Sequence, residues 1–372
     1  MNFLRDERIK KLAKVLIHHS LKLRPKEKVL IIAPLAAKPL VAAIIQEAYA
    51  NKSYPYLELY DDELSVAIGQ HAEREQLELR VKWDLYKYKD IDASITIAAE
   101  ANDAEYSALS PEKMKLVGEV LKPANDFLVD ERRWVLLNWP TPGLAQKAGM
   151  STTAFADFLL DVCNVDYVKM AERQKRLKEL MDKTDKVRIV SPGTDLTFSI
   201  KGIPAVMCAG ECNIPDGEVY TAPVRESVNG TITFNTPSPY HGKVFHNICL
   251  TFKDGKIVKA EASDTNRLNE ILDTDEGARY IGEFAIGLNP LIKEPIGDIL
   301  FDEKICGSLH FTPGDAYYEA DNGNNSSIHW DMVLIQRPEY GGGELYFDDV
   351  LIRKDGLFVI DSLKGLNPEN LT

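Results

Sequence analysis

The hydrophobic pattern of this 372-residue chain changes character near Thr184, and this change strongly limits the folds available to it. Before that point, apolar runs alternate with amphipathic segments of helical period. The run 28–33 is continuously apolar, as is typical of a strand buried on both faces. Further strands are expected at 56–60, 93–98 and 134–137, and helices at 5–21, 39–50, 110–121 and 152–183. This alternation predicts an α/β domain over residues 1–184 with a doubly wound, mainly parallel sheet.

After residue 184 the predicted strands are short and are separated by turn signals. The segments 187–190 and 196–200 are rich in β-forming residues, and turns are expected at Asp254-Gly255 and at 341–343. The runs 345–352 and 357–360, joined around Asp355-Gly356, predict a terminal hairpin. We therefore expect a mostly antiparallel β (α+β) catalytic domain over residues 185–372. A chain of this length is suited to two domains.

The charge balance argues against nucleic acid as a partner. The chain has 44 Lys and Arg residues against 57 Asp and Glu residues, a net charge of −13, and this field repels a phosphate backbone. The turn after the first strand, 33–38, contains no glycine. Both the dinucleotide fingerprint and the phosphate loop need glycines there, so the parallel sheet is predicted to be a scaffold.

The sequence also predicts a soluble, cytoplasmic protein without a membrane partner. Its most apolar stretch, 29–45, is interrupted by Pro34, Lys38 and Pro39, so we expect no membrane span. The first eight residues are too charged for a secretion signal. Five scattered cysteines fit reduced thiols better than a disulfide framework.

The clearest local signal for chemistry is the pair His329 and Asp331. In an extended segment, residues two apart point to the same face, so the imidazole and the carboxylate should project together. Such a pair is half of a divalent metal site. By itself the pair is also common by chance, as a surface histidine beside a solvated aspartate.

Four other residues extend this set, although each also allows an ordinary structural role. Glu283 lies in the apolar run 279–287, where an ionised carboxylate is costly unless a cation is near. Glu218 follows a Pro-Asp-Gly turn, His310 ends a strand-like stretch, and Glu303 precedes it. Together they form the mixed carboxylate and imidazole set of co-catalytic metal sites. Spacing alone leaves open whether they converge.

Several motifs in a fixed order carry a resemblance to a known family. The chain resembles the aminopeptidase T / aminopeptidase S family of thermophilic-type metallo-aminopeptidases. The resemblance runs from about residue 5 to Asn367, and its motifs are 139–150, 214–223, Gly282-Glu283, Asp302-Glu303, His310, Tyr317 and 327–331.

The resemblance implies a metal-dependent aminopeptidase that cleaves the N-terminal peptide bond with a water molecule activated by two metals. It implies two divalent ions per chain (zinc, cobalt or magnesium), peptide substrates with a free N-terminus, and a homodimer. The implied metal ligands are Glu218, Glu283, His310, His329 and Asp331. Glu303 matches a glutamate that also faces the metals and is the candidate general base. Tyr317 matches a tyrosine that assists catalysis.

The chain departs from the family pattern in three places. Gly217 stands where a second glutamate is usual, and the segment 304–307 replaces a different one before His310. The interval from His310 to His329 is short, at 19 residues. These departures keep two alternatives open: another metal-dependent amide hydrolase, or a non-catalytic relative with a modified site.

Overall fold

The computed structural model describes residues 6–102, 104–240 and 242–372. The chain forms two compact units, Met1–Asn164 with Gly210–Pro215, and Val165–Ala209 with Asp216–Thr372. This division differs from the predicted ranges 1–184 and 185–372 by one helix and one short strand. Helix α8 (Tyr167–Met181) contacts strands of the second unit, where Gln174 Nε2 donates to the Cys208 carbonyl at 2.9 Å. Strand β8 (Asn213–Ile214) instead pairs with β4 of the first unit.

The first unit contains a five-stranded sheet in which every pair is parallel. Its strand order is β2 (Tyr54–Tyr60), β1 (Lys28–Pro34), β3 (Ala93–Ala98), β4 (Arg133–Asn138) and β8. The central strands β1 and β3 are buried over most of their length, because helices cover a parallel sheet on both faces. The predicted α/β architecture is confirmed.

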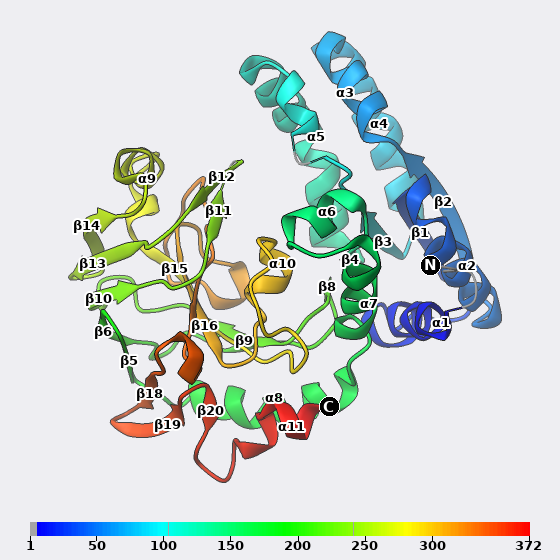
Figure 1. Ribbon diagram of the computed structural model, residues 1–372. Helices are drawn as coiled ribbons and strands as arrows, with labels where there is room; N and C mark the ends of the chain where they lie inside the picture. Colours follow the sequence, from blue (N-terminus) through cyan, green and yellow to red (C-terminus); the bar gives the residue numbers. More distant parts are fainter. Residues whose placement is uncertain (1–5, 103, 241) are drawn as a thin grey trace. The chain divides into compact units, whose positions relative to one another are not determined.

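Helices pack against both faces of β1. On one face, Leu30 belongs to a core cluster with Tyr88 of α4 (Arg74–Asp90) and Leu128 of α5 (Pro111–Glu131). Figure 1 shows α4 and α5 running side by side. Alternate residues of β1, such as Ile31, face the other way, and α2 contacts this strand. The remaining helices of this unit are α1 (Glu7–Lys14), which continues as a π-helix (Val15–Ser20), α2 (Lys38–Ala50), α3 (Asp62–His71), α6 (Pro142–Lys147) and α7 (Thr152–Val162).

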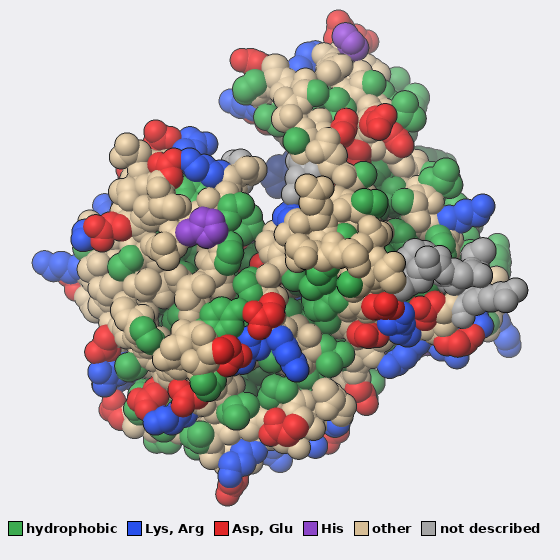
Figure 2. Space-filling model, in the orientation of Figure 1, with side chains coloured by type: hydrophobic (Ala, Val, Ile, Leu, Met, Phe, Trp, Pro, Cys, Tyr) green, Lys and Arg blue, Asp and Glu red, His purple; other side chains and the backbone are tan. Residues whose placement is uncertain are grey.

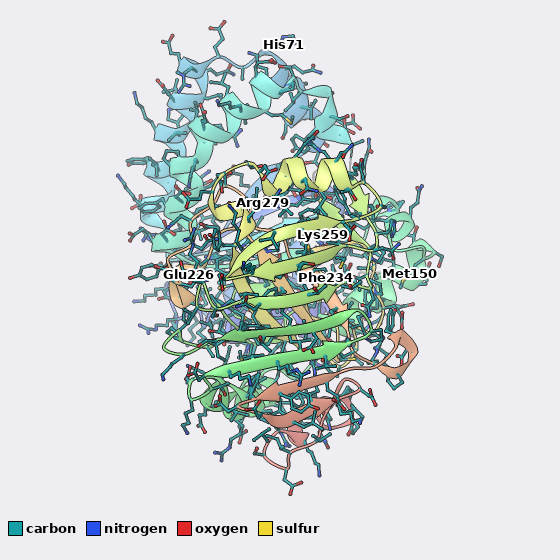
Figure 3. The ribbon with its side chains drawn as sticks, turned by 90° about the vertical axis from the view of Figure 1, so that its left-hand side faces the viewer. His71, Met150, Glu226, Phe234, Lys259 and Arg279 are labelled. Atoms are coloured by element: carbon teal, nitrogen blue, oxygen red, sulfur yellow. The ribbon has the colours of Figure 1, made fainter. Side chains whose placement is uncertain are left out.

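The second unit contains an antiparallel eight-stranded sheet, seen face-on in Figure 3. Its strands, in order across the sheet, are β14 (Lys256–Glu261), β13 (Cys249–Lys253), β10 (Asn229–Thr233), β6 (Thr194–Ser199), β5 (Lys186–Ser191), β18 (Glu344–Phe347), β19 (Val350–Lys354) and β20 (Leu357–Phe358). Helix α9 (Thr265–Leu272) contacts the β14 edge.

A five-stranded antiparallel sheet stacks on the eight-stranded one. Its strand order is β17 (Met332–Ile335), β16 (Ser308–Pro313), β15 (Ile281–Gly287), β9 (Glu218–Thr221) and β7 (Val206–Cys208). Phe198 of β6 joins the two sheets, since its ring lies 5.1 Å from the rings of both Phe284 and Phe311. The predicted antiparallel β domain is therefore confirmed. The hairpin of β11 (Ser238–Tyr240) and β12 (Lys243–Phe245) and the short helices α10 (Ile299–Asp302) and α11 (Pro368–Leu371) complete the unit.

Two elements predicted as continuous are broken in the structure. The helix expected at 152–183 is two helices, because Asn164 Nδ2 donates to the Leu160 carbonyl at the end of α7 and Asp166 caps the start of α8. The strand expected at 345–352 is interrupted by Asp348 and Asp349, which have φ values of 48° and 64°. Aspartate tolerates this left-handed conformation better than most residues, so a tight turn forms there.

The described residues include no helix with both the length and the apolar character needed to cross a membrane. On the face shown in Figure 2, acidic and basic side chains are interspersed. This distribution agrees with the charge pattern of the sequence.

Candidate metal centre

One face of the five-stranded sheet collects the predicted ligands. Because strand side chains alternate, Phe284 and Phe311 point into the core between the sheets while their neighbours Glu283 and His310 point to the opposite face. The register pairs Gly287 with Glu218, so Glu218 lies on this same face. Asp331, just before β17, continues the face, since Val333 pairs with His310.

The side chains of this face meet in two groups that share Glu283. His310 Nε2 lies 3.1 Å from Glu283 Oε1 and 3.6 Å from Glu218 Oε2. His329 Nε2 lies 3.4 Å from Glu283 Oε2 and 3.3 Å from Asp331 Oδ1. The two oxygens of Glu283 therefore face two different imidazoles.

These distances fit metal coordination. Donor atoms about 2.1 Å from a tetrahedral divalent ion are about 3.4 Å apart. The donor atoms of Glu218, Glu283 and His310 lie within 4.8 Å of one another, as do those of Glu283, His329 and Asp331. Glu303 forms a third such group with His310 and Asp331. The structure thus brings together all six predicted metal-ligating residues.

Backbone carbonyls orient both imidazoles. His310 Nδ1 donates to the Glu303 carbonyl at 3.2 Å, and His329 Nδ1 donates to the Asp315 carbonyl at 2.9 Å. Each Nε2 is thereby left for the carboxylate groups. Thr312 Oγ1 similarly donates to Asp331 Oδ1 at 2.7 Å. Such outer contacts are usual around metal ligands because they hold the ring or carboxylate in position.

A separate carboxylate anchors the segment before His329. Asp275 accepts hydrogen bonds of 2.7 Å from the Ser326 hydroxyl and from both the backbone nitrogen and the hydroxyl of Ser327. Burial raises the pKa of Asp275, but these hydrogen bonds outweigh it and lower the pKa to about 2. The loop that delivers His329 is therefore tied down by an ionised aspartate.

Two buried polar atoms of the centre have no hydrogen-bond partner among the described residues. They are Glu218 Oε2 and His329 Nε2, one in each of the two groups. Buried polar atoms without a partner are rare, since leaving one costs about 1–3 kcal/mol. A divalent ion in each group would satisfy both atoms, so the residues present fit the metals that the sequence implies.

The carboxylates dominate the electrostatics of this centre. Burial raises the pKa of Glu218, although Lys304 and His310 oppose the shift. Burial alone would lower the pKa of His329, yet Asp331 and Glu283 raise it to about 11. The first shift reports desolvation of a carboxylate, and the second reports the negative charge that surrounds His329.

Tyr317 lies at the exposed side of the group. Its side chain is 48% exposed, and its ring centroid lies 4.6 Å from that of His329 and 5.7 Å from that of Tyr220. Burial of the hydroxyl and the negative charges of Glu283 and Asp331 raise its pKa. The hydroxyl therefore keeps its proton and remains a hydrogen-bond donor at neutral pH.

Lys304 is a feature of the centre that sequence reasoning did not assign. Its side chain is fully buried, and its ammonium pairs with Glu303 Oε1 and lies 3.7 Å from Glu218 Oε1. The sequence offered one signal for a role in the centre. Lys304 directly follows Glu303 and precedes a segment of apolar and small residues. Burial could not be read from that position because it is set by packing with segments far apart in the sequence.

The backbone explains why glycine occupies position 217. Gly217 has a φ of +137°, and a Cβ there would lie 3.0 Å from the Asn289 nitrogen. Its carbonyl also accepts a 2.8 Å hydrogen bond from Leu288. A side chain here would therefore adopt a strained backbone conformation and would press on Asn289, which follows the strand that carries Glu283.

Comparison with known proteins agrees with this geometry. The family model described as thermophilic metalloprotease (M29) matches residues 5–352. The chain belongs to this metalloprotease family. The predicted resemblance is thus confirmed, and with it the prediction of a hydrolase of the metallo-aminopeptidase class that uses divalent metal.

Individual M29 relatives match over most of their length. The chain is 24% identical to aminopeptidase 2 of Geobacillus stearothermophilus, covering 94% of this chain and 95% of the relative. It is 26% identical to aminopeptidase T of Thermus thermophilus, covering 88% and 92%. A solved structure of wild-type AmpT from Thermus thermophilus superimposes with a TM-score of 0.78 at 23% identity, covering 95% of this chain and 99% of that one, which establishes the common fold.

Proposed function

We propose that the chain is an aminopeptidase whose centre holds two divalent metal ions. One position would be formed by Glu218, Glu283 and His310, and the other by Glu283, His329 and Asp331. The observation that carries this proposal is the division of Glu283, whose two oxygens face different imidazoles at 3.1 and 3.4 Å. A carboxylate placed in this way is suited to bridge two ions.

When bound, two divalent ions would lower the pKa of a water molecule toward neutrality and polarise the scissile carbonyl. The two imidazoles favour zinc or cobalt among the candidate metals, and magnesium remains the third. One ion would polarise the carbonyl, and the other would offer a place for the free, uncharged α-amine of the peptide, which would account for a requirement for an unblocked N-terminus.

Two further residues have proposed catalytic roles. Glu303 groups with His310 and Asp331, and its side chain is 14% exposed, so it is the candidate general base. Tyr317 retains its proton and stands beside the His329 ring at the exposed side. Its hydroxyl would donate a hydrogen bond to the oxyanion of the tetrahedral intermediate.

The proposed substrates are peptides with a free N-terminus. The names of the M29 relatives, aminopeptidase 2 and aminopeptidase T, support this substrate class. A homodimer and a cytoplasmic location remain proposals that rest on the family resemblance and on the composition.

Elemental analysis combined with activity assays tests this proposal. We expect about two divalent ions per chain, and hydrolysis of unblocked aminoacyl amides that is lost on chelation and restored by zinc or cobalt. N-terminally blocked amides should not be hydrolysed. Glu283→Gln should lose both metal and activity. Absence of bound metal under excess zinc or cobalt would overturn the proposal, and cleavage of blocked amides alone would point to another amide hydrolase.

A further inference from the structure

Lys304 places a fixed positive charge inside the metal centre. Its side chain is completely buried and follows α10, so the ammonium has left water and needs anionic partners nearby. Its partners are Glu303 Oε1 and, at 3.7 Å, Glu218 Oε1. Both carboxylates belong to the predicted metal-binding set.

The same lysine faces a fourth cluster of potential ligands. The donor atoms of Cys208, Asp216 and Glu218 lie within 4.8 Å of one another, which by geometry alone resembles another metal site. The Lys304 ammonium interacts electrostatically with all three residues. A positive charge therefore already faces this cluster, and it pairs with Glu218 at 3.7 Å.

The two proposed metal positions consequently differ in charge. Glu218 divides its oxygens, with Oε1 toward Lys304 and Oε2 toward His310. In the other position, Asp331 receives a hydrogen bond from the neutral Thr312 hydroxyl. Among the described residues, Asp331 makes no ion pair with lysine or arginine. The ammonium thus pairs directly with a ligand of the first position, whereas it acts on Asp331 of the other position more weakly and beyond ion-pair distance.

We propose that Lys304 makes the two metal positions unequal, so that the Glu283–His329–Asp331 position binds its ion tightly and the Glu218–Glu283–His310 position binds its ion weakly. The inference rests on the proposed two-metal function. Its physical basis is the repulsion between an ammonium and a dication that share one carboxylate in a desolvated place. It follows that the occupancy of the Glu218–Glu283–His310 position changes with the free metal concentration.

Metal titration of the chelated protein tests this inference directly. Zinc or cobalt binding would be followed by calorimetry and by competition with a chromophoric chelator. We expect two steps whose dissociation constants differ by at least about tenfold, and Lys304→Met should tighten the weak step by about tenfold or more, because it removes a neighbouring like charge. The strong step should remain nearly unchanged.

Two ligand variants assign the steps to their positions. Glu218→Gln should abolish the weak step and keep the strong one, whereas Asp331→Asn should abolish the strong step. The matched charge control is Lys259→Met. Lys259 lies on the exposed β14 strand, labelled in Figure 3, with a side chain that is 62% exposed. The Lys259→Met variant removes one lysine charge that lies away from the metal centre, so both binding steps should persist.

Each outcome separates this inference from the proposed function. Two ions of equal affinity in an active enzyme would overturn the inference and leave the function intact, whereas no metal binding would overturn the function itself. If folded Lys304→Met binds the ion of the weak step with unchanged or lower affinity, the inference is also overturned. Lys304→Gln provides a polar alternative. If neither lysine variant folds, the order of loss in Glu218→Gln and Asp331→Asn still decides which position is the weak one.

Discussion

Replacing Gly282 by alanine is expected to loosen the metal centre without altering any ligand. Gly282 lies at the irregularity of β15 between Ile281 and Glu283, directly against the loop that follows β16. A Cβ at this position would lie 2.5 Å from the Gly314 carbonyl oxygen and closer still to the Asp315 carbonyl oxygen. The second of these oxygens accepts the hydrogen bond from His329 Nδ1.

The magnitude follows from that shared oxygen. Real Cβ atoms essentially never approach another atom within 3.0 Å, so the Asp315 carbonyl must move away. A displacement on the order of 1 Å breaks the hydrogen bond that orients the His329 ring, and loss of such an outer contact typically weakens metal binding 10- to 100-fold. Overpacking between β15 and the loop should also lower the free energy of unfolding by about 1–3 kcal/mol.

Metal competition assays and urea unfolding would measure both effects, the latter in the presence of chelator. The control is Gly118→Ala in α5, where a Cβ meets nothing within 4 Å. That variant should leave metal binding unchanged and stabilise the helix by up to about 1 kcal/mol. Wild-type metal affinity and stability in Gly282→Ala would refute the reasoning, since the loop would then not be constrained by the bulge.

Three further predictions follow from the same unit. Phe284→Ala should lower the free energy of unfolding by about 3–5 kcal/mol, measured by chemical denaturation, because it empties the space between the two sheets; a loss below 1 kcal/mol would contradict the proposed core. The folded-state pKa of Asp275 is about 2, below its ordinary value, so its stabilisation is present above about pH 4 and is lost as the pH falls toward 2. Wild type should therefore lose about 1 kcal/mol more than Asp275→Asn over that range, allowing for partial exposure, and equal losses would exclude this role. Zinc at 100 times its dissociation constant should raise the free energy of unfolding by about 2.7 kcal/mol, and an unchanged melting temperature would show that no metal binds the folded state.

Local pattern was sufficient for much of the first unit. The continuous apolar run of β1 and the alternation with amphipathic helices predicted a parallel sheet, because only a strand covered on both faces is apolar on both. The same reasoning failed at 163–166 and at Asp348-Asp349. In both places a polar side chain bonds to the backbone and ends the element, whereas the hydrophobic period continues through the break.

The candidate site shows a similar division. The spacing of His329 and Asp331 predicted that they project together, and their side chains do lie 3.3 Å apart. That spacing contained no information on Glu218 or Glu283. These two residues are 65 positions apart in the sequence and approach each other because strand β9 pairs with strand β15. Their order along the chain was recognisable only as a family pattern, and their roles as ligands remain predictions.

By itself, the sequence determined the two-domain α/β and β architecture, the kinds of donor available and the pairing of neighbours two residues apart. These are properties of local period and side-chain chemistry. Only the tertiary structure decided that Glu283 divides its oxygens between His310 and His329, and that Lys304 is buried against Glu218. Strand register and burial are set by long-range packing, so the charge that surrounds each metal position becomes visible only once the sheet is assembled.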